Sequence, residues 1–132
     1  MKIKKVIFGL LFTSVFFAAC KKDDSIDDIN SKLQNRWAVT DGLLFAGAPI
    51  NDTILFYTGT SADYFDFRSN GKVYSSLNGE IDTSDYRIIS GNKVVVDNDT
   101  SEIKILTNSR LQVFNKNYDN AVVQELTINL SR

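Results

Sequence analysis

The sequence predicts an all-β protein: an antiparallel, eight-stranded, up-and-down meander that closes into a barrel, with a short N-terminal helical turn. Three observations support this prediction. After residue 37 the chain consists of short segments that alternate apolar and polar side chains, which is typical of strands with one buried face. Turn residues such as Asn70-Gly71 separate these segments. The connections are too short for crossover helices, so consecutive strands must pair antiparallel.

The predicted elements follow one another in a simple order. The helical turn is expected within residues 29–37, with Asn30 or Ser31 as its N-terminal cap and Leu33 facing inward. The eight strands are expected at residues 37–46, 62–68, 71–76, 83–90, 92–97, 101–107, 110–116 and 121–130.

The hairpins give the clearest signals. In "YFDFRSNGKVYS", Phe65 and Phe67 alternate with other residues before an Asn-Gly pair that supplies the positive φ angles of a tight turn. The last strand places Leu126, Ile128 and Leu130 on one face. Because few helices are available to cover such faces, the sheet must bury them by pairing with another sheet or by closing. Eight strands close around an interior that side chains fill or that holds one small ligand.

The first 19 residues are interpreted as an export signal. Lys2, Lys4 and Lys5 precede an apolar run at residues 6–17, and two alanines supply the small side chains that a signal peptidase needs. The run of about a dozen residues is shorter than the roughly 20 that a helix needs to cross a bilayer. An uncleaved membrane anchor and an ordinary secretory signal with Cys20 as an idle thiol are the alternatives.

The junction "FAAC", which ends at Cys20, resembles the lipobox of bacterial lipoproteins, with Phe17 where leucine is usual. The resemblance implies that the Cys20 thiol receives a diacylglyceryl group and that the chain is cut before it. Two or more acyl chains hold a protein on a membrane, because each buried CH₂ contributes about 0.8 kcal/mol. The sequence "CKKDD" further resembles the surface-export signal of Bacteroidetes lipoproteins. This implies a lipid-anchored protein of the outer membrane, compatible with exposure at the cell surface.

Residues 20–29 are expected to form a flexible acidic and basic tether between the anchor and a barrel domain at residues 30–132. The mature chain has 12 basic and 16 acidic residues, a net charge of −4. No basic cluster is present, so nucleic-acid binding is not expected. The absence of histidine and the single cysteine remove the usual zinc ligands and nucleophile–base pairs. We therefore expect no metal site, no cofactor and no enzymatic activity.

Residues 30–132 resemble the lipocalin-like domains found in Bacteroidetes lipoproteins. The resemblance rests on a short helix, then "NRW" at the head of the first strand, then a meander with a "Phe-x-x-Asn-Gly" hairpin. In lipocalins the tryptophan closes the base of the barrel beneath an arginine of the final strand. The resemblance implies that Trp37 closes the barrel here, with Arg132 as its partner and Arg110 in second place. Asn35 stands where the family has glycine.

Residues 47–61 are the least regular part of the predicted barrel. They contain the only proline, Pro49, and an apolar run at residues 54–57. In lipocalins the long connection after the first strand covers the mouth of the barrel, so the resemblance implies a lid. An extra edge strand, or a short helix packed on the barrel wall, is the alternative.

Acidic residues at the predicted turns do not form a recognisable catalytic pair. Glycoside hydrolysis needs two carboxyl groups at a set separation, and nothing in the sequence fixes one. Aspartate at turns usually bonds to the local backbone, so solvated side chains are expected. The segment "DNDTSE", residues 97–102, lacks the glycine and glutamate of an EF-hand loop, so it predicts a hairpin turn and not a calcium site. The acidic residues concerned are Asp63, Asp66, Glu80, Asp82 and Asp85.

Aromatic residues are the best candidates for contact with a ligand. A barrel that binds an apolar molecule needs such a lining, although the same rings would fill the core of a barrel that binds nothing. We expect non-catalytic binding of a small, mostly apolar ligand; the alternative is a filled barrel that contacts or inhibits a cell-envelope protein. An interior cavity of about 300 Å³ or more, open at one end, would favour ligand binding. The candidate residues are Phe45, Phe56, Tyr57, Phe65, Phe67, Tyr74, Tyr86 and Phe114.

Overall fold

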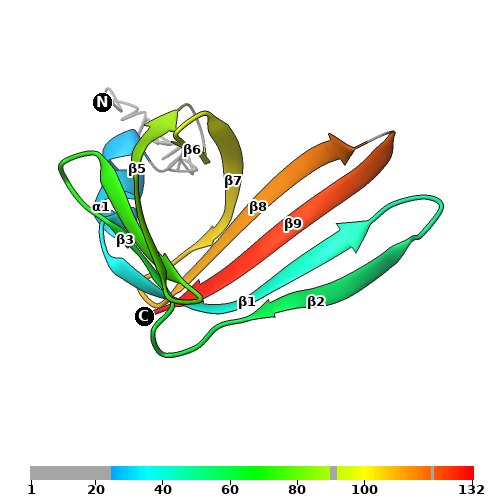
Figure 1. Cartoon of the computed structure of the whole chain (residues 1–132). Coiled ribbons are helices and arrows are strands. Elements are labelled where there is room, and N and C mark those ends of the chain that lie inside the picture. The colour runs from blue at the N-terminus through cyan, green and yellow to red at the C-terminus, as the bar shows by residue number, and fades with distance from the viewer. Residues whose placement is uncertain (1–24, 90–91, 120) are drawn as a thin grey trace, which may run out of the picture.

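The computed structural model describes residues 25–89, 92–119 and 121–132, and Figure 1 shows their arrangement. The predicted signal, Cys20 and most of the predicted tether lie outside these residues. The described elements are α1 (Ile26–Leu33), β1 (Arg36–Ala46), β2 (Asp52–Thr58), β3 (Tyr64–Phe67), β4 (Lys72–Leu77), β5 (Glu80–Ile89), β6 (Lys93–Val96), β7 (Asp99–Leu106), β8 (Arg110–Asp119) and β9 (Val122–Ser131).

Eight of the strands close into an antiparallel barrel, as the sequence pattern predicts. The strands β3 to β9 pair in sequence order, and β1 joins both ends of the series. Trp37 of β1 pairs with Phe65 of β3, and Val39 pairs with Leu130 of β9. Closure satisfies the backbone groups that an open meander would leave unpaired at its edges. The predicted fold class is therefore confirmed.

Tight turns with positive φ angles connect the barrel hairpins. Gly71 has a φ of 76° between β3 and β4, and Gly79 has a φ of 81° between β4 and β5. Only glycine adopts such angles without steric cost. Asn70 adds a local contact, because its Oδ1 accepts a hydrogen bond from the Lys72 amide at 3.0 Å. The Asn-Gly signal in the sequence therefore marks a real hairpin.

The helix begins earlier than the sequence analysis predicts. Ser25 caps α1, and its Oγ accepts a hydrogen bond from the Asp28 amide at 3.2 Å. Acidic residues in the first turn favour this start, because negative charge stabilises a helix N-terminus. The expected cap at residues 30–31 is wrong, and residues 26–29 are helical and not part of a flexible tether. No helix in the described part of the chain is long and apolar enough to span a membrane.

The hydrophobic core lies where α1 meets the barrel. The helix packs against β5 and β7 and contributes two buried side chains, so it covers apolar surface that the strands leave open. The most deeply buried apolar residues are Leu33, Trp37 and Leu111, each no more than 1% exposed. The core residues are Ile29, Leu33, Trp37, Val39, Phe67, Val73, Tyr86, Val94, Ile103, Leu111 and Leu130.

Two hairpins extend beyond the barrel and form an open sheet, here called the projecting sheet (residues 41–58, 115–119 and 121–127). In Figure 1 the β1–β2 and β8–β9 hairpins extend to the right, away from the rest of the barrel. The order of strands in this region is β2-β1-β9-β8. Leu44 of β1 pairs with Ile54 on one side and with Leu126 on the other, and Leu126 also pairs with Asn115.

The segment at residues 47–61 contains β2 and does not form a lid. This strand pairs antiparallel with β1, which corresponds to the edge-strand alternative. Its apolar run extends the ladder of β1 and does not fold back over the barrel. The side chains of Ile54, Leu55 and Phe56 are 51%, 60% and 48% exposed, so the outer part of this strand remains accessible.

Two irregularities mark the place where β1 leaves the barrel. The register shifts between Val39 and Asp41 in the pairing with β9, and between Gly42 and Leu43 in the pairing with β2. An extra residue in one strand reverses which of the following side chains face inward. A Cβ atom at Gly42 would lie 2.7 Å from two carbons of the Phe56 ring, so glycine allows this ring to cross β1.

Candidate ligand-binding site

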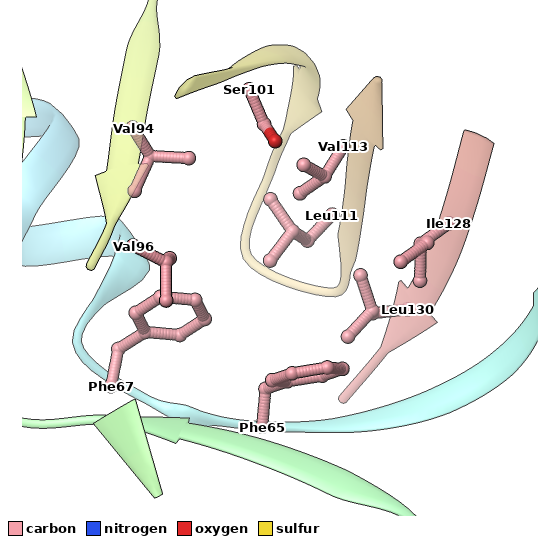
Figure 2. A pocket seen from close by; sticks show the side chains of 9 residues that line it. All are labelled: Phe65, Phe67, Val94, Val96, Ser101, Leu111, Val113, Ile128 and Leu130. Atoms are coloured by element: carbon pink, nitrogen blue, oxygen red, sulfur yellow. The ribbon is translucent and has the colours of Figure 1, made fainter. Parts of the chain in front are cut away.

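The first cavity, of about 170 Å³, lies inside the barrel. Figure 2 shows side chains from β3, β6, β7, β8 and β9 pointing toward a shared space. All but one are apolar, and the exception is Ser101, whose oxygen points toward the cavity. The lining residues are Phe65, Phe67, Val94, Val96, Ser101, Leu111, Val113, Ile128 and Leu130.

The second cavity, of about 200 Å³, lies where the barrel continues into the projecting sheet. Phe65 and Ile128 line both cavities, so these two side chains stand between them. Neither cavity alone reaches about 300 Å³, the volume that would favour ligand binding over a filled barrel. A cavity of about 150 Å³ nevertheless holds one benzene molecule, so each is large enough for a small ligand. The second cavity is lined by Val39, Asp41, Gly42, Phe56, Tyr57, Phe65, Leu77, Leu126 and Ile128.

Four of the eight predicted aromatic residues line these cavities. Phe65 and Phe67 contribute to the first cavity, and Phe56, Tyr57 and Phe65 contribute to the second. The structure therefore brings together aromatic rings from β2 and β3, two strands that are adjacent in the sequence but pair with different parts of β1.

Tyr86, a fifth predicted aromatic residue, belongs to the core and lines neither cavity. Its ring meets that of Phe67 edge to face, with a centroid separation of 5.0 Å. The hydroxyl donates a hydrogen bond to the Arg68 carbonyl at 2.8 Å. Burial raises the pKa of Tyr86. Tyr86 therefore supports one wall of the site from behind Phe67.

The remaining three predicted residues, Phe45, Tyr74 and Phe114, lie outside both cavities, and a ligand-lining role for them is not supported. Arg68 stacks on Tyr74 with its Cζ 4.2 Å from the ring centroid, and Lys104 Nζ lies 5.0 Å from that of Phe114. Phe45 lines an open surface depression. These three side chains point away from the cavities, because successive residues of a strand face opposite sides of the sheet.

Aliphatic residues form most of the first cavity, whereas the sequence analysis predicts only aromatic residues as ligand contacts. Alternation along the strands carried the signal, since Leu111 and Val113 share one face of β8, and Ile128 and Leu130 share one face of β9. Their pairing in register, Leu111 with Leu130 and Val113 with Ile128, places all four on the same wall. The sequence pattern alone does not give that register.

Asp63 is buried, so its expected role as a solvated turn residue is wrong. Only 1% of its surface is exposed, and its carboxylate accepts hydrogen bonds from the Thr60 amide at 2.7 Å, the Thr60 hydroxyl at 2.8 Å and the Asn78 amide at 3.0 Å. The bonds from Thr60 are the main reason that the pKa of Asp63 is lowered. Asp63 therefore joins the turn before β3 to the turn after β4.

Tyr57 places a buried hydroxyl beside this carboxylate. Burial and the nearby Asp63 raise the pKa of Tyr57. Its Oη has no partner that meets hydrogen-bond geometry among the described residues, although it lies close enough to Asp63 for the two groups to influence each other. The ring of Tyr57 lines the second cavity, whereas its hydroxyl is buried on the side of Asp63.

A second buried polar atom without a partner belongs to Asn115 of β8. The Nδ2 group of Asn115 donates to the Thr100 carbonyl at 3.0 Å and to Ser101 Oγ at 3.2 Å. Its Oδ1 is buried and has no hydrogen-bond partner within the described ranges. Because Ser101 lines the first cavity, the Asn115 amide lies next to that cavity.

The barrel end opposite the projecting sheet contains Trp37, which is fully buried. Its Nε1 donates to the Leu33 carbonyl at 2.9 Å, and the Arg132 Cζ lies 5.4 Å from the ring centroid. This is the tryptophan–arginine pairing that the sequence resemblance implies. Neither residue lines the first or the second cavity.

The cavities carry little charge and no metal-binding arrangement. No lysine or arginine lines either of them, and Asp41 is the only charged residue in the two linings. Within the described part of the chain, no three histidine, cysteine or acidic side chains come together in a way that could hold a metal ion. The chemistry available at this site is therefore apolar contact supplemented by a few hydrogen bonds.

Comparison with known proteins gives a result only at the level of structure. No protein-family model and no curated protein matches the chain. Among solved structures, the chain is similar to the bovine lipocalin allergen Bos d 2, with a TM-score of 0.51 and 16% sequence identity. The similarity covers 78% of this chain and 74% of that one. At this identity the comparison shows the fold alone: the chain forms a lipocalin-like β-barrel.

Proposed function

We propose that the protein binds a small, mostly apolar molecule inside its barrel, without catalysis. The observation that carries this proposal is the first cavity, with its apolar lining and single hydroxyl group. Small-molecule sites are typically concave and apolar, with a few polar groups that orient the ligand. The unpartnered Asn115 Oδ1 supports the proposal further, because native proteins rarely leave such atoms unsatisfied.

The non-catalytic part of the proposal rests on the groups near the cavities. Ser101 is the only hydroxyl in the first cavity, and the side chain that bonds to it is an amide, which is not a base. Asp63 accepts three hydrogen bonds and its pKa is lowered, which suits a structural carboxylate better than a general base poised near neutral pH.

Titration with toluene tests the binding proposal. A form of the chain that begins at residue 20 and carries Cys20→Ser keeps α1 and all nine strands. We expect toluene to shift the NMR signals of Phe65, Val113 and Leu130. Filling the cavity with Val113→Phe should abolish these shifts, whereas Val122→Phe, outside both cavities, should not. Absence of shifts at saturating toluene would contradict the proposal.

Membrane anchoring is a further part of the proposed function. The "FAAC" junction and the single cysteine support lipidation at Cys20, and "CKKDD" supports a place in the outer membrane. In its native host the protein should incorporate a fatty-acid probe and fractionate with the outer membrane. The Cys20→Ser variant should lose the label, and normal labelling of that variant would refute lipidation at this residue.

A role in binding another cell-envelope protein is the second candidate, and strand β2 favours it. This strand lies at the edge of the projecting sheet, and Ile54, Leu55 and Phe56 are about half exposed. An exposed apolar edge of this kind can pair with an extended strand of a partner. A photo-crosslinking amino acid at Leu55 should then give one discrete adduct in cells. The same probe at Ile81, which is 78% exposed on β5, is the control.

A further inference from the structure

Ser101 lines the first cavity, and Asn115 is hydrogen-bonded to it from the neighbouring strand β8. Asn115 follows Leu111 and Val113 on the interior face of β8, and both of those residues line the cavity. Its Nδ2 donates to the Thr100 carbonyl and to Ser101 Oγ. A carbonyl oxygen only accepts hydrogen bonds, so the contact with Thr100 fixes which end of the amide is nitrogen.

This orientation leaves one acceptor and one donor unused. Asn115 Oδ1 is buried without a partner among the described residues. Ser101 Oγ accepts from Asn115 and makes no other side-chain hydrogen bond in the described part of the chain, so its own hydrogen remains to be donated. In Figure 2 the Ser101 oxygen points toward the apolar side chains of the cavity. The unused donor of Ser101 and the unused acceptor of Asn115 lie on two side chains that are hydrogen-bonded to each other. Together they match a ligand group that both donates and accepts a hydrogen bond.

The charge around the cavities restricts the ligand further. No lysine, arginine or carboxylate residue lines the first cavity, and Asp41, the one charged residue in the lining of the second cavity, accepts a hydrogen bond from Asn129. An anionic ligand would lose its hydration without gaining a cationic partner. A neutral polar group bears a much smaller desolvation cost.

We infer that the first cavity selects an uncharged molecule, about the size of one six-membered ring, that carries a hydroxyl group. The ligand hydroxyl donates to Asn115 Oδ1 and accepts from Ser101, while its apolar part contacts Phe65 and Leu111. The size follows from the volume of about 170 Å³, since about 150 Å³ holds benzene. This inference rests on the proposed function and adds the chemical class of the ligand.

Three ligands of nearly equal size test this selectivity: toluene, benzyl alcohol and benzoate. Their affinities are measured by calorimetry at pH 7.5 on the form that begins at residue 20 with Cys20→Ser. Benzoate should bind at least about tenfold more weakly than benzyl alcohol. Ser101→Ala or Asn115→Leu should weaken benzyl alcohol binding by about five- to tenfold, the value of one net hydrogen bond. Toluene affinity should stay within about twofold in both variants.

Asn117→Leu is the matched control, since it changes the same residue type on the same strand face at an exposed position. It should leave all three affinities unchanged. Thermal melting checks that each variant folds, and Ser101→Ala carries the test if Asn115→Leu is unstable.

Two results would overturn the inference while leaving the proposed function intact. One is an equal loss of toluene and benzyl alcohol affinity in the folded variants, or no loss of either. The other is binding of benzoate as tight as that of benzyl alcohol. Failure of all three ligands to bind the parent protein would overturn the proposed function and this inference with it.

Discussion

The closed barrel and the projecting sheet are built from some of the same strands but bury their side chains differently. In the barrel half of β1, buried and exposed residues alternate, and Trp37 and Val39 are no more than 5% exposed. In the projecting half of the same strand, residues 43–46 are half-buried on both faces. Side chains on the inner face of the sheet pack against other side chains only where the strands curve around the closed interior of the barrel. Backbone pairing therefore continues beyond the region that side-chain packing stabilises.

The difference shows that regular hydrogen bonding and core packing are separate contributions to this fold. The register shift between Val39 and Asp41 lies at the boundary between the two regions. Such a shift bends a strand and changes its twist, which suits a strand that leaves a curved barrel for a more open sheet. We therefore expect stability to be concentrated at the α1 end, and the following predictions test that expectation in order of decreasing effect.

Removing Trp37 should have the largest effect, because it is fully buried at the closed end. Trp37→Ala should lower the free energy of unfolding by about 3–5 kcal/mol, as is usual for a buried large aromatic residue. Chemical denaturation measures the change, and Ile81→Ala, at a 78% exposed site, is the control. An unchanged unfolding curve for Trp37→Ala would mean that the closed end is not the stable part of the molecule.

Substitutions of two leucines, one in each region, compare the stability of the barrel with that of the projecting sheet. Leu111 is 1% exposed in the barrel, and Leu55 is 60% exposed in the projecting sheet. Leu111→Ala should lower the free energy of unfolding by about 2–5 kcal/mol, because it leaves a cavity. Leu55→Ala should stay within about 0.5 kcal/mol, as for most surface substitutions. Equal losses, measured by urea denaturation, would show that the projecting sheet is packed against something in solution.

Asp63 tests the connection from β2 back into the barrel, and its effect depends on pH. The folded state lowers the pKa of this carboxyl below its ordinary value of 3.8, so the ionised form contributes stability above that value. The contribution is lost as the pH falls through the lowered pKa. Asp63→Asn should therefore lower the melting temperature at pH 7, and the difference from the parent should shrink from about pH 5 to about pH 2.

The control for Asp63 is Asp85→Asn, which removes a carboxylate that is 74% exposed. It should have a smaller effect on the melting temperature at neutral pH, because exposed ion pairs contribute little. A melting difference for Asp63→Asn that is constant from pH 7 down to about pH 2 would contradict the assigned role of the charge.

The smallest effect is expected at Gly42, where a Cβ atom would meet the Phe56 ring. The obstacle is the far end of a half-exposed side chain, so Gly42→Ala should move the ring and cost no more than about 1 kcal/mol. Amide hydrogen exchange in β2 should become faster while exchange in β8 stays unchanged. Combining Gly42→Ala with Phe56→Ala should restore slow exchange, and failure to do so would place the strain in the backbone.

Local signals in the sequence were sufficient to predict the barrel. Alternation and the Asn-Gly turn placed Phe65 and Phe67 on one face and ordered the hairpins correctly. The strand β2 was harder to recognise because "ILFY" is a continuous apolar run without alternation, and such runs do not distinguish strands from other buried segments. Strand length and turn signals therefore predicted the barrel meander but not the additional strand β2 that extends it.

Side-chain direction was the part of the site that sequence could not supply. Counting by twos from Trp37 would place Phe45 inside the barrel, yet the extra residue between Val39 and Asp41 reverses the parity, and Phe45 faces outward. A bulge of this kind has no reliable local signature. The buried amide of Asn115 was missed for a related reason, because its neighbour Ser101 comes from another strand and is brought near only by closure.

The hydrogen bond from Trp37 Nε1 to the Leu33 carbonyl joins the end of α1 to the start of β1, so it lies on the path by which a pull on the N-terminal side would enter the barrel. Tension applied to the chain before Ser25 passes first into α1 and then, within the next few residues, into β1. There it spreads along the ladder between β1 and β9, which runs from Ala38 to Ala46. A pull on the N-terminal side is thus resisted by the tryptophan-centred packing before it reaches either hairpin tip.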